Sequence, residues 1–168
     1  MKLPPRGAVL EKELAELLRE RALTLAVAES CTGGLIGHRI TEVPGSSAYF
    51  LLGVVAYSDR AKKELLGVRE ETLAAHGAVS EQVAVEMALG VRARAAADLG
   101  VATTGVAGPG GGTAAKPVGT VCVALAWQAG VWSGRYHLGE IGRGRVKAET
   151  ARLALERLWE RAQMVGGS

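Results

Sequence analysis

Three short polar segments of this chain combine residue types that can do chemistry, and each follows an apolar run. The first spans residues 29–34 (ESCTGG). Ligands of open α/β sheets bind outside the carboxyl ends of the strands, which is where this segment falls. Its two adjacent glycines permit a sharp turn, and free N–H groups at the start of the following helix predict a site for an anion or an oxyanion. The same pattern is also that of an N-capping Ser or Thr followed by a glycine turn.

The second segment, residues 57–62 (YSDRAK), supplies a lysine about one turn into an expected helix. A serine nucleophile needs a base, and lysine can replace the more usual histidine. Its reference pKa of about 10.4 makes deprotonation at pH 7 cost about 4.6 kcal/mol, unless burial or a nearby charge lowers that pKa. A Ser–Lys pair therefore requires a partly dehydrated Lys62. Tyr57 could hydrogen-bond the pair and help to relay the proton. The alternative is a solvated helix lysine beside Lys63.

Histidine and metal chemistry have little support in the sequence. The three histidines have no motif around them and are expected on the surface: His38, His76 and His137. Cys31 and Cys122 are far apart, and no His or Cys cluster has the spacing of metal ligands. We therefore expect no metal and no cofactor.

The third segment, residues 103–120 (TTGVAGPGGGTAAKPVGT), is rich in glycine. Many exposed N–H groups in such a loop can form an anion-binding nest. No GK[ST] follows, so the loop is not a phosphate loop, and it also fails the dinucleotide pattern GxGxxG. A flexible crossover loop is the alternative, although Thr103 and Thr104 leave an expected strand directly beside the glycines.

These segments must be positioned by helices and short buried strands that alternate along the chain. Helices are expected over residues 10–21, 35–43, 59–66, 80–98 and 145–163, and strands over 23–28, 49–57, 101–106, 118–128 and 131–138. Ala129-Gly130 is a plausible hairpin turn between the last two strands. The pattern predicts a layered α/β domain with a mostly parallel central sheet, one C-terminal hairpin, and helices on both faces.

Composition excludes several classes of protein. With 168 residues, of which 48% are hydrophobic and 22% charged, the chain is long enough for a single domain over residues 1–168 and too apolar for a disordered one. No apolar run reaches the ~18–20 residues that a membrane helix needs, and no export signal is recognised. The net charge of +3 is scattered, so no nucleic-acid surface is predicted. Two cysteines suit a reducing cytoplasm, where we expect the protein to be found.

Taken together, four motifs closely resemble the CinA C-terminal domain family. They are AESCTGG at residues 28–34, YSDRAK at 57–62, HGAVSEQVAVEMA at 76–88 and TGVAGPGGGTAAKPVGTV at 104–121. The resemblance covers about residues 10–159. Members of this family are nicotinamide-nucleotide amidohydrolases, also called nicotinamide mononucleotide deamidases. The family also occurs fused behind a larger N-terminal domain, and the present sequence resembles the stand-alone form.

The resemblance implies an activity and a set of residues. The family converts nicotinamide mononucleotide to nicotinate mononucleotide and ammonia without a metal. By the match, Ser30 is the nucleophile, Lys62 the general base and Tyr57 an assisting group. Cys31 is interpreted as buried packing, although a thiol is intrinsically the better nucleophile. The residues expected to bind substrate or the oxyanion are Thr32, Gly33, Gly34, Ser46, Ser47, Thr104, Gly105, Gly108, Gly110 and Arg143.

The sequence departs from the family pattern at two places. Members typically show Gly-Asp-Arg before the last helix, whereas this chain has Gly139-Glu140-Ile141-Gly142-Arg143, so Arg145 is an alternative to Arg143. Asp59 stands where Asn is common, and either residue can cap a helix. A non-catalytic nucleotide-binding or interaction module tied to competence or DNA repair is the rival function. A homo-oligomer is left open, because the first helix is apolar enough to contribute to a dimer.

Overall fold

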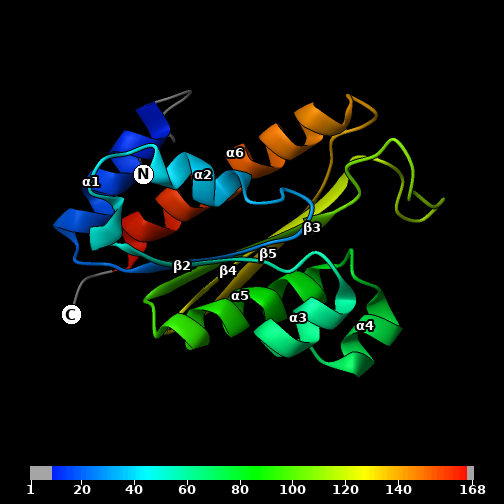
Figure 1. Cartoon of the computed structure of the whole chain (residues 1–168), viewed down its shortest axis with the longest axis horizontal. Coiled ribbons are helices and arrows are strands. Elements are labelled where there is room, and N and C mark those ends of the chain that lie inside the picture. The colour runs from blue at the N-terminus through cyan, green and yellow to red at the C-terminus, as the bar shows by residue number, and fades with distance from the viewer. Residues whose placement is uncertain (1–8, 166–168) are drawn as a thin grey trace.

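The computed structural model describes residues 9–165, which form one five-stranded sheet with helices on both faces (Figure 1). The strands are β1 (Leu25–Glu29), β2 (Phe50–Val55), β3 (Leu99–Gly105), β4 (Thr120–Trp127) and β5 (Gly130–His137). The helices are α1 (Val9–Glu20), α2 (Leu35–Thr41), α3 (Asp59–Leu66), α4 (Glu70–His76), α5 (Glu81–Ala95) and α6 (Arg143–Met164), with a short 3-10 turn, η1, at Ser46–Ala48. The expected layered α/β class is confirmed.

The strand order is β2-β1-β3-β4-β5. Strand β1 pairs in parallel with β2 and with β3, whereas β3–β4 and β4–β5 are antiparallel. The carboxyl ends of β1, β2 and β3 therefore meet at the same end of the sheet. This end is where the polar segments that follow each of the three strands come together.

Two hydrophobic cores lie on opposite faces of the sheet. One contains the apolar faces of α1, α2 and α6, with Leu14, Leu18, Leu155 and Leu158 almost fully buried. The other packs α3, α4 and α5 on the opposite face, as Figure 1 shows. The apolar side of α1 is thus used inside the molecule, which removes the reason for expecting it at a dimer contact.

Helix α3 approaches α5 closely at one glycine. A Cβ at Gly90 of α5 would lie only 1.9 Å from the carbonyl oxygen of Leu66 at the end of α3. Glycine is therefore needed at this position for the two helices to touch. The contact fixes α3 against α5 and, with it, the backbone that carries the side chain of Lys62.

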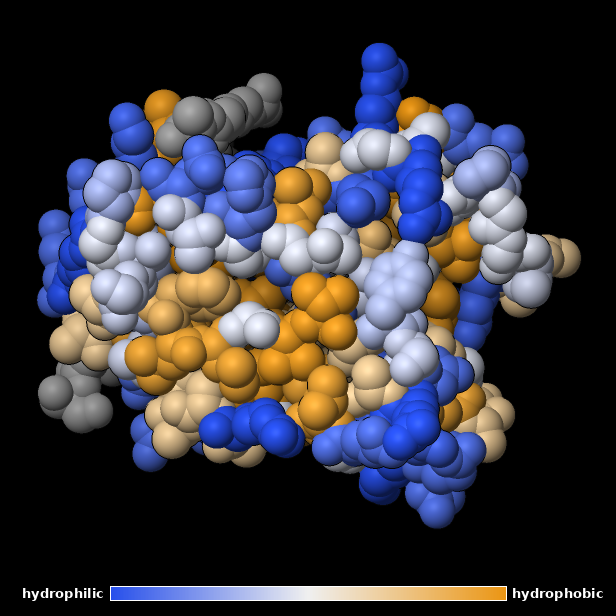
Figure 2. Space-filling view, in the orientation of Figure 1, coloured by the Kyte–Doolittle hydropathy of each residue, from blue (hydrophilic) through white to orange (hydrophobic). Residues whose placement is uncertain are grey.

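Strand β2 differs from the buried strand expected over residues 49–57. Within residues 9–165 it lies at the edge of the sheet, with β1 as its only strand neighbour, and alternate residues are exposed. Leu51 is 48% and Val55 50% exposed. Figure 2 shows the result as an apolar band over β2 between more polar helix layers. An unprotected apolar edge of this kind favours pairing with another strand.

The remaining differences from the expected elements are small. Helix α4 was not expected, because only Thr72 and Leu73 of its seven residues are buried, too few to produce a helical pattern. Helix α5 ends at Ala95 rather than at residue 98, since Ala96 adopts a left-handed conformation. The hairpin between β4 and β5 is confirmed, although Gly130 already belongs to β5. None of the helices within residues 9–165 has an apolar stretch that would cross a membrane.

Candidate active site

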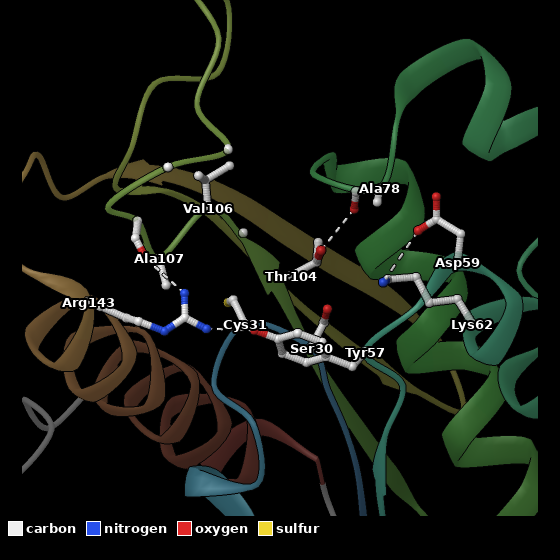
Figure 3. Close-up of a pocket in the computed structure, with 14 residues that line it drawn as sticks. Ser30, Cys31, Tyr57, Asp59, Lys62, Ala78, Thr104, Val106, Ala107 and Arg143 are labelled. Atoms are coloured by element: carbon white, nitrogen blue, oxygen red, sulfur yellow. Dashed lines mark hydrogen bonds and ion pairs between the residues drawn. The ribbon is translucent and has the colours of Figure 1, made fainter.

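A cavity of about 270 Å³ opens at the carboxyl ends of β1, β2 and β3 (Figure 3). Its walls come from the segments that follow these strands and from the start of α6. The residues that line it are Ser30, Cys31, Tyr57, Asp59, Lys62, Ala78, Thr104, Gly105, Val106, Ala107, Gly108, Gly110, Gly111 and Arg143. The structure thus brings the three polar segments of the sequence to one place.

Ser30 follows directly after β1 and is held by the neighbouring strand. Its backbone N–H donates to the carbonyl of Thr103 in β3, at 3.0 Å. The residue is only 7% exposed, and its side chain lines the cavity. Ser30 therefore sits on a rigid strand end rather than on a mobile loop.

The turn after Ser30 is closed by the buried carboxylate of Glu29. This carboxylate accepts hydrogen bonds from the backbone N–H groups of Gly34, Ile36 and Gly37, at 3.0, 3.1 and 2.8 Å. Its negative charge lies at the positive N-terminal end of α2. The N–H groups that the sequence analysis offered to an anion are therefore already engaged within the protein.

Thr32, Gly33 and Gly34, which were expected to bind substrate or the oxyanion, do not line the cavity. The Gly33 N–H donates to the Ser30 carbonyl, and the Thr32 hydroxyl is paired with that of Thr103 at 2.8 Å. These residues shape the turn that presents Ser30.

Lys62 is the most unusual side chain of the site. It is 2% exposed, although lysine is almost never fully buried without a partner. Lys62 and Leu66 are spaced four residues apart on α3 and are both buried, so they share the helix face that turns inward. The alternative of a solvated surface lysine is excluded. The amine of Lys62 points into the same cavity that Ser30 lines (Figure 3).

Burial lowers the pKa of Lys62 below its usual value, because a charged amine loses hydration inside the protein. The Asp59 carboxylate, 3.6 Å from the Lys62 amine, opposes this shift by attracting the ammonium form. Cys31 and Tyr57 are the other titratable groups that act on the amine, and both favour its charged form more weakly. The net effect is an amine that releases its proton more easily than a surface lysine does.

Cys31 is not a competing nucleophile at neutral pH. Burial raises the pKa of its thiol to about 12, so the reactive thiolate is scarce. The side chain packs with Ala107, Val121 and Val146, in agreement with the expected packing role. Both cysteines are free thiols, and Cys122 is also buried.

Arg143 forms the opposite wall of the cavity from Lys62 (Figure 3). It donates to the Tyr57 hydroxyl at 2.7 Å and to the Gly108 carbonyl at 2.8 Å. These bonds tie the segment after β2, the glycine-rich loop and the start of α6 together. Arg145 is exposed and does not line the cavity, so of the two arginines only Arg143 is at the site.

Thr104 presents an oxygen to the cavity in a defined orientation. Its hydroxyl donates to the Ala78 carbonyl at 2.9 Å, so its hydrogen is committed. The lone pairs of the oxygen are left to accept a hydrogen bond from a ligand. Gly105, Gly108 and Gly110 line the cavity beside it, as expected from the glycine-rich loop.

Ser46 and Ser47, which were expected to contact substrate, lie outside the cavity. They belong to η1, which comes just before β2. Because β2 is parallel to β1, the start of β2 is at the opposite end of the sheet from Ser30. The three histidines are exposed and do not line the cavity, as expected.

Several residues that line the cavity were not expected from the sequence. Ala78 lies after the unexpected helix α4. Val106, Ala107 and Gly111 belong to the glycine-rich loop, and the only sequence signal for them was that this loop was expected near the site. Asp59 stood within the YSDRAK motif but was interpreted only as a helix cap. Within residues 9–165, no group of three or more His, Cys, Asp or Glu side chains is arranged to hold a metal ion.

Comparisons with known proteins agree with this architecture. The model of the CinA C-terminal domain family matches residues 8–162. A "CinA-like protein" of Chloroherpeton thalassium is 60% identical over 120 residues, which cover 71% of this chain and 29% of that protein. One from Chlorobaculum tepidum is 55% identical over 146 residues, or 87% of this chain and 32% of that protein. The chain thus spans about a third of the length of these curated relatives.

A solved structure matches over almost its whole length. The competence/damage-inducible protein CihA from Agrobacterium tumefaciens superposes with a TM-score of 0.87 and is 43% identical, over 97% of this chain and 99% of that one. A match of this extent covers the sheet, both helix layers and the segments that line the cavity. On these grounds, the chain belongs to the CinA C-terminal domain family.

Proposed function

We propose that the chain is a metal-independent amidohydrolase that converts nicotinamide mononucleotide to nicotinate mononucleotide and ammonia. The observation that carries the proposal is the buried amine of Lys62 in the cavity that Ser30 lines. A buried amine with a lowered pKa is what a neutral base at moderate pH requires. A module that only binds nucleotides has no use for an amine kept from water, which favours the enzyme over the rival function.

The proposed reaction is acyl transfer in two steps. Neutral Lys62 takes the proton of the Ser30 hydroxyl while the Ser30 oxygen bonds to the carboxamide carbon. The carbon–nitrogen bond then breaks, and the proton passes from Lys62 to the leaving nitrogen, which departs as ammonia. Water attacks the resulting ester, gives one proton to Lys62, and releases the nicotinate product. Lys62 returns that proton to Ser30.

The remaining cavity residues fit supporting roles. The Thr104 oxygen accepts a hydrogen bond from the substrate amide, because its own hydrogen is engaged by Ala78. The Arg143 guanidinium and the backbone of the glycine-rich loop supply donors for the phosphate. Tyr57 accepts a hydrogen bond from Arg143 and is close enough to influence Lys62. It therefore helps to hold the Arg143 side of the cavity at a fixed position relative to the Lys62 side.

An ammonia-release assay with nicotinamide mononucleotide tests the proposal. Ser30→Ala should reduce turnover about 10³-fold or more, because it removes the nucleophile. Lys62→Arg should be similarly inactive, since arginine keeps its proton at any working pH. Circular dichroism of both variants checks that the fold is intact. Undiminished turnover in Ser30→Ala, or most of the activity kept in Lys62→Arg, would contradict the Ser–Lys mechanism.

A further inference from the structure

The charged groups of the cavity are unequally distributed between its two sides. Three charged side chains line it, namely Arg143, Lys62 and Asp59. Figure 3 shows Arg143 on one side and the Lys62–Asp59 pair on the other, with Ser30 and Thr104 between them. Asp59 is the only carboxylate among the described residues that line the cavity. The cavity therefore has a cationic end and an end that carries a carboxylate beside a titratable amine.

The Asp59 carboxylate is accessible to a ligand, although it is ion-paired with Lys62. Its side chain is 61% exposed, whereas that of Lys62, 3.6 Å away, is 2% exposed. The helix does not depend on this carboxylate for its N-cap, because the Ser58 hydroxyl accepts the hydrogen bond from the Ala61 N–H. The place of Asp59 in the first turn of α3 suits the positive end of that helix, but this helix role does not require the carboxylate to line the cavity beside a buried base.

In the free protein, the carboxylate works against the proposed base. It attracts the ammonium form of Lys62 and so makes proton release harder. This opposition ends if a second cation takes the place of the ammonium as the partner of Asp59. The nicotinamide ring of the proposed substrate is such a cation, and the amide that it carries must reach Ser30.

We propose that Asp59 is a specificity-determining residue that recognises the positive ring of the substrate and selects cationic over uncharged nicotinamide nucleotides. This inference rests on the proposed function. With the phosphate at the Arg143 end and the amide at Ser30, which lies between Arg143 and Asp59, the charged ring occupies the cavity that the carboxylate lines. The ring then pairs with Asp59, and Lys62 releases its proton to solvent before it acts on Ser30. The cavity is thus matched to a zwitterion with an anion at one end and a cation near the other.

Binding measurements separate this role from catalysis. In a Ser30→Ala background, which prevents turnover, calorimetry compares nicotinamide mononucleotide with its 1,4-dihydro form. The dihydro form has the same amide, ribose and phosphate but an uncharged ring. We expect a preference of about five- to tenfold for the cationic ring, the size of effect that a partly solvated charge pair gives. Adding Asp59→Asn should abolish the preference, and Asp59→Glu should largely keep it.

Glu64→Gln is the matched control. It removes one negative charge from the same helix, where Glu64 is exposed and paired with Arg60, away from the cavity. This variant should keep the preference. A preference that survives Asp59→Asn, or that is lost equally in Glu64→Gln, overturns the assignment.

The outcomes also distinguish this inference from the proposed function. Ammonia release by the unmodified chain, without a ring preference that depends on Asp59, overturns the inference and leaves the function standing. A preference that depends on Asp59, without ammonia release, supports cation recognition and overturns the hydrolase. Failure of both nucleotides to bind overturns both.

Discussion

The two turns that lead from strand to helix at the site each contain a buried charged side chain, but the two side chains differ in how well they are paired. In the turn from β1 to α2, the Glu29 carboxylate is 2% exposed and accepts three backbone hydrogen bonds. In the turn from β2 to α3, the Lys62 amine is equally buried, and Asp59 at 3.6 Å is its only ion-pair partner within residues 9–165. A well-paired buried charge contributes to stability, whereas a poorly paired one costs stability and is available for chemistry.

The variant expected to have the largest effect is Lys62→Met, which keeps most of the volume of the side chain. Activity should fall roughly 10²–10⁴-fold, because the general base is lost. Stability at neutral pH should instead rise by about 1 kcal/mol, because an amine that is costly to bury is replaced by an apolar group. Ammonia release and thermal unfolding measure the two effects.

The pH dependence of unfolding provides the control for Lys62→Met. A lysine whose pKa is lower in the folded than in the unfolded state binds fewer protons when folded. Its contribution to stability therefore grows as pH rises towards the usual lysine value and is lost as pH falls through the lowered pKa. The variant should lack this dependence. A variant that is less stable than the parent at neutral pH would show that Lys62 is structural.

Glu29→Gln should have the second largest effect, with the opposite sign for stability. The amide keeps one acceptor oxygen but turns a donor toward N–H groups that need an acceptor. We expect a loss of about 2–3 kcal/mol, since hydrogen bonds to a charged group are the stronger kind. Activity should fall with it, because the turn presents Ser30. Chemical unfolding gives the measurement.

Glu42→Gln serves as the control for Glu29→Gln. Glu42 follows α2, its side chain is 70% exposed, and it faces only His38 at 3.9 Å. Its replacement should change the free energy of unfolding by less than about 0.5 kcal/mol. A loss of similar size in both variants would mean that the N-terminal position of the Glu29 carboxylate has no special value.

The smallest expected effect comes from Ser58→Ala, the cap of the second turn. Its hydroxyl accepts from the Ala61 N–H at 3.1 Å in an exposed setting. The loss should be about 1 kcal/mol, the usual cost of removing a serine cap. Ser58→Asp, which can also cap, should restore stability in the same unfolding experiment. An Ala variant that loses as much stability as Glu29→Gln would remove the distinction between the two turns.

Much of the fold could be predicted because most of its helices and strands have a local signal in the sequence. Leu10, Leu14 and Leu18 repeat at helical spacing, and the five apolar runs correspond to the five strands. Helix α4 lacks such a signal, and the exposed side of β2 could not be predicted because an apolar run does not reveal its number of strand neighbours.

Site residues could be predicted where their residue type is specific for the chemistry. They were missed where hydrogen-bond partners or the direction of a strand determine whether a residue reaches the cavity. Ser30, Lys62, Thr104 and Arg143 do line one cavity. The donors expected at Gly34 are taken by Glu29, a carboxylate five residues earlier whose direction the sequence does not specify. Ser46 and Ser47 follow a suggestive Pro-Gly pair, but the parallel direction of β2 carries them to the far end of the sheet.

The order of residues along the chain already supplies the side chains of the site: a serine after the first strand, a lysine one turn into the helix after the second, and glycines after the third. The three-dimensional arrangement brings these segments together, because β1 pairs with β2 on one side and β3 on the other, all in parallel. It also decided the state of Lys62. Hydration of an amine depends on everything packed around it, and here α3 is pressed against α5 and turns the lysine away from solvent.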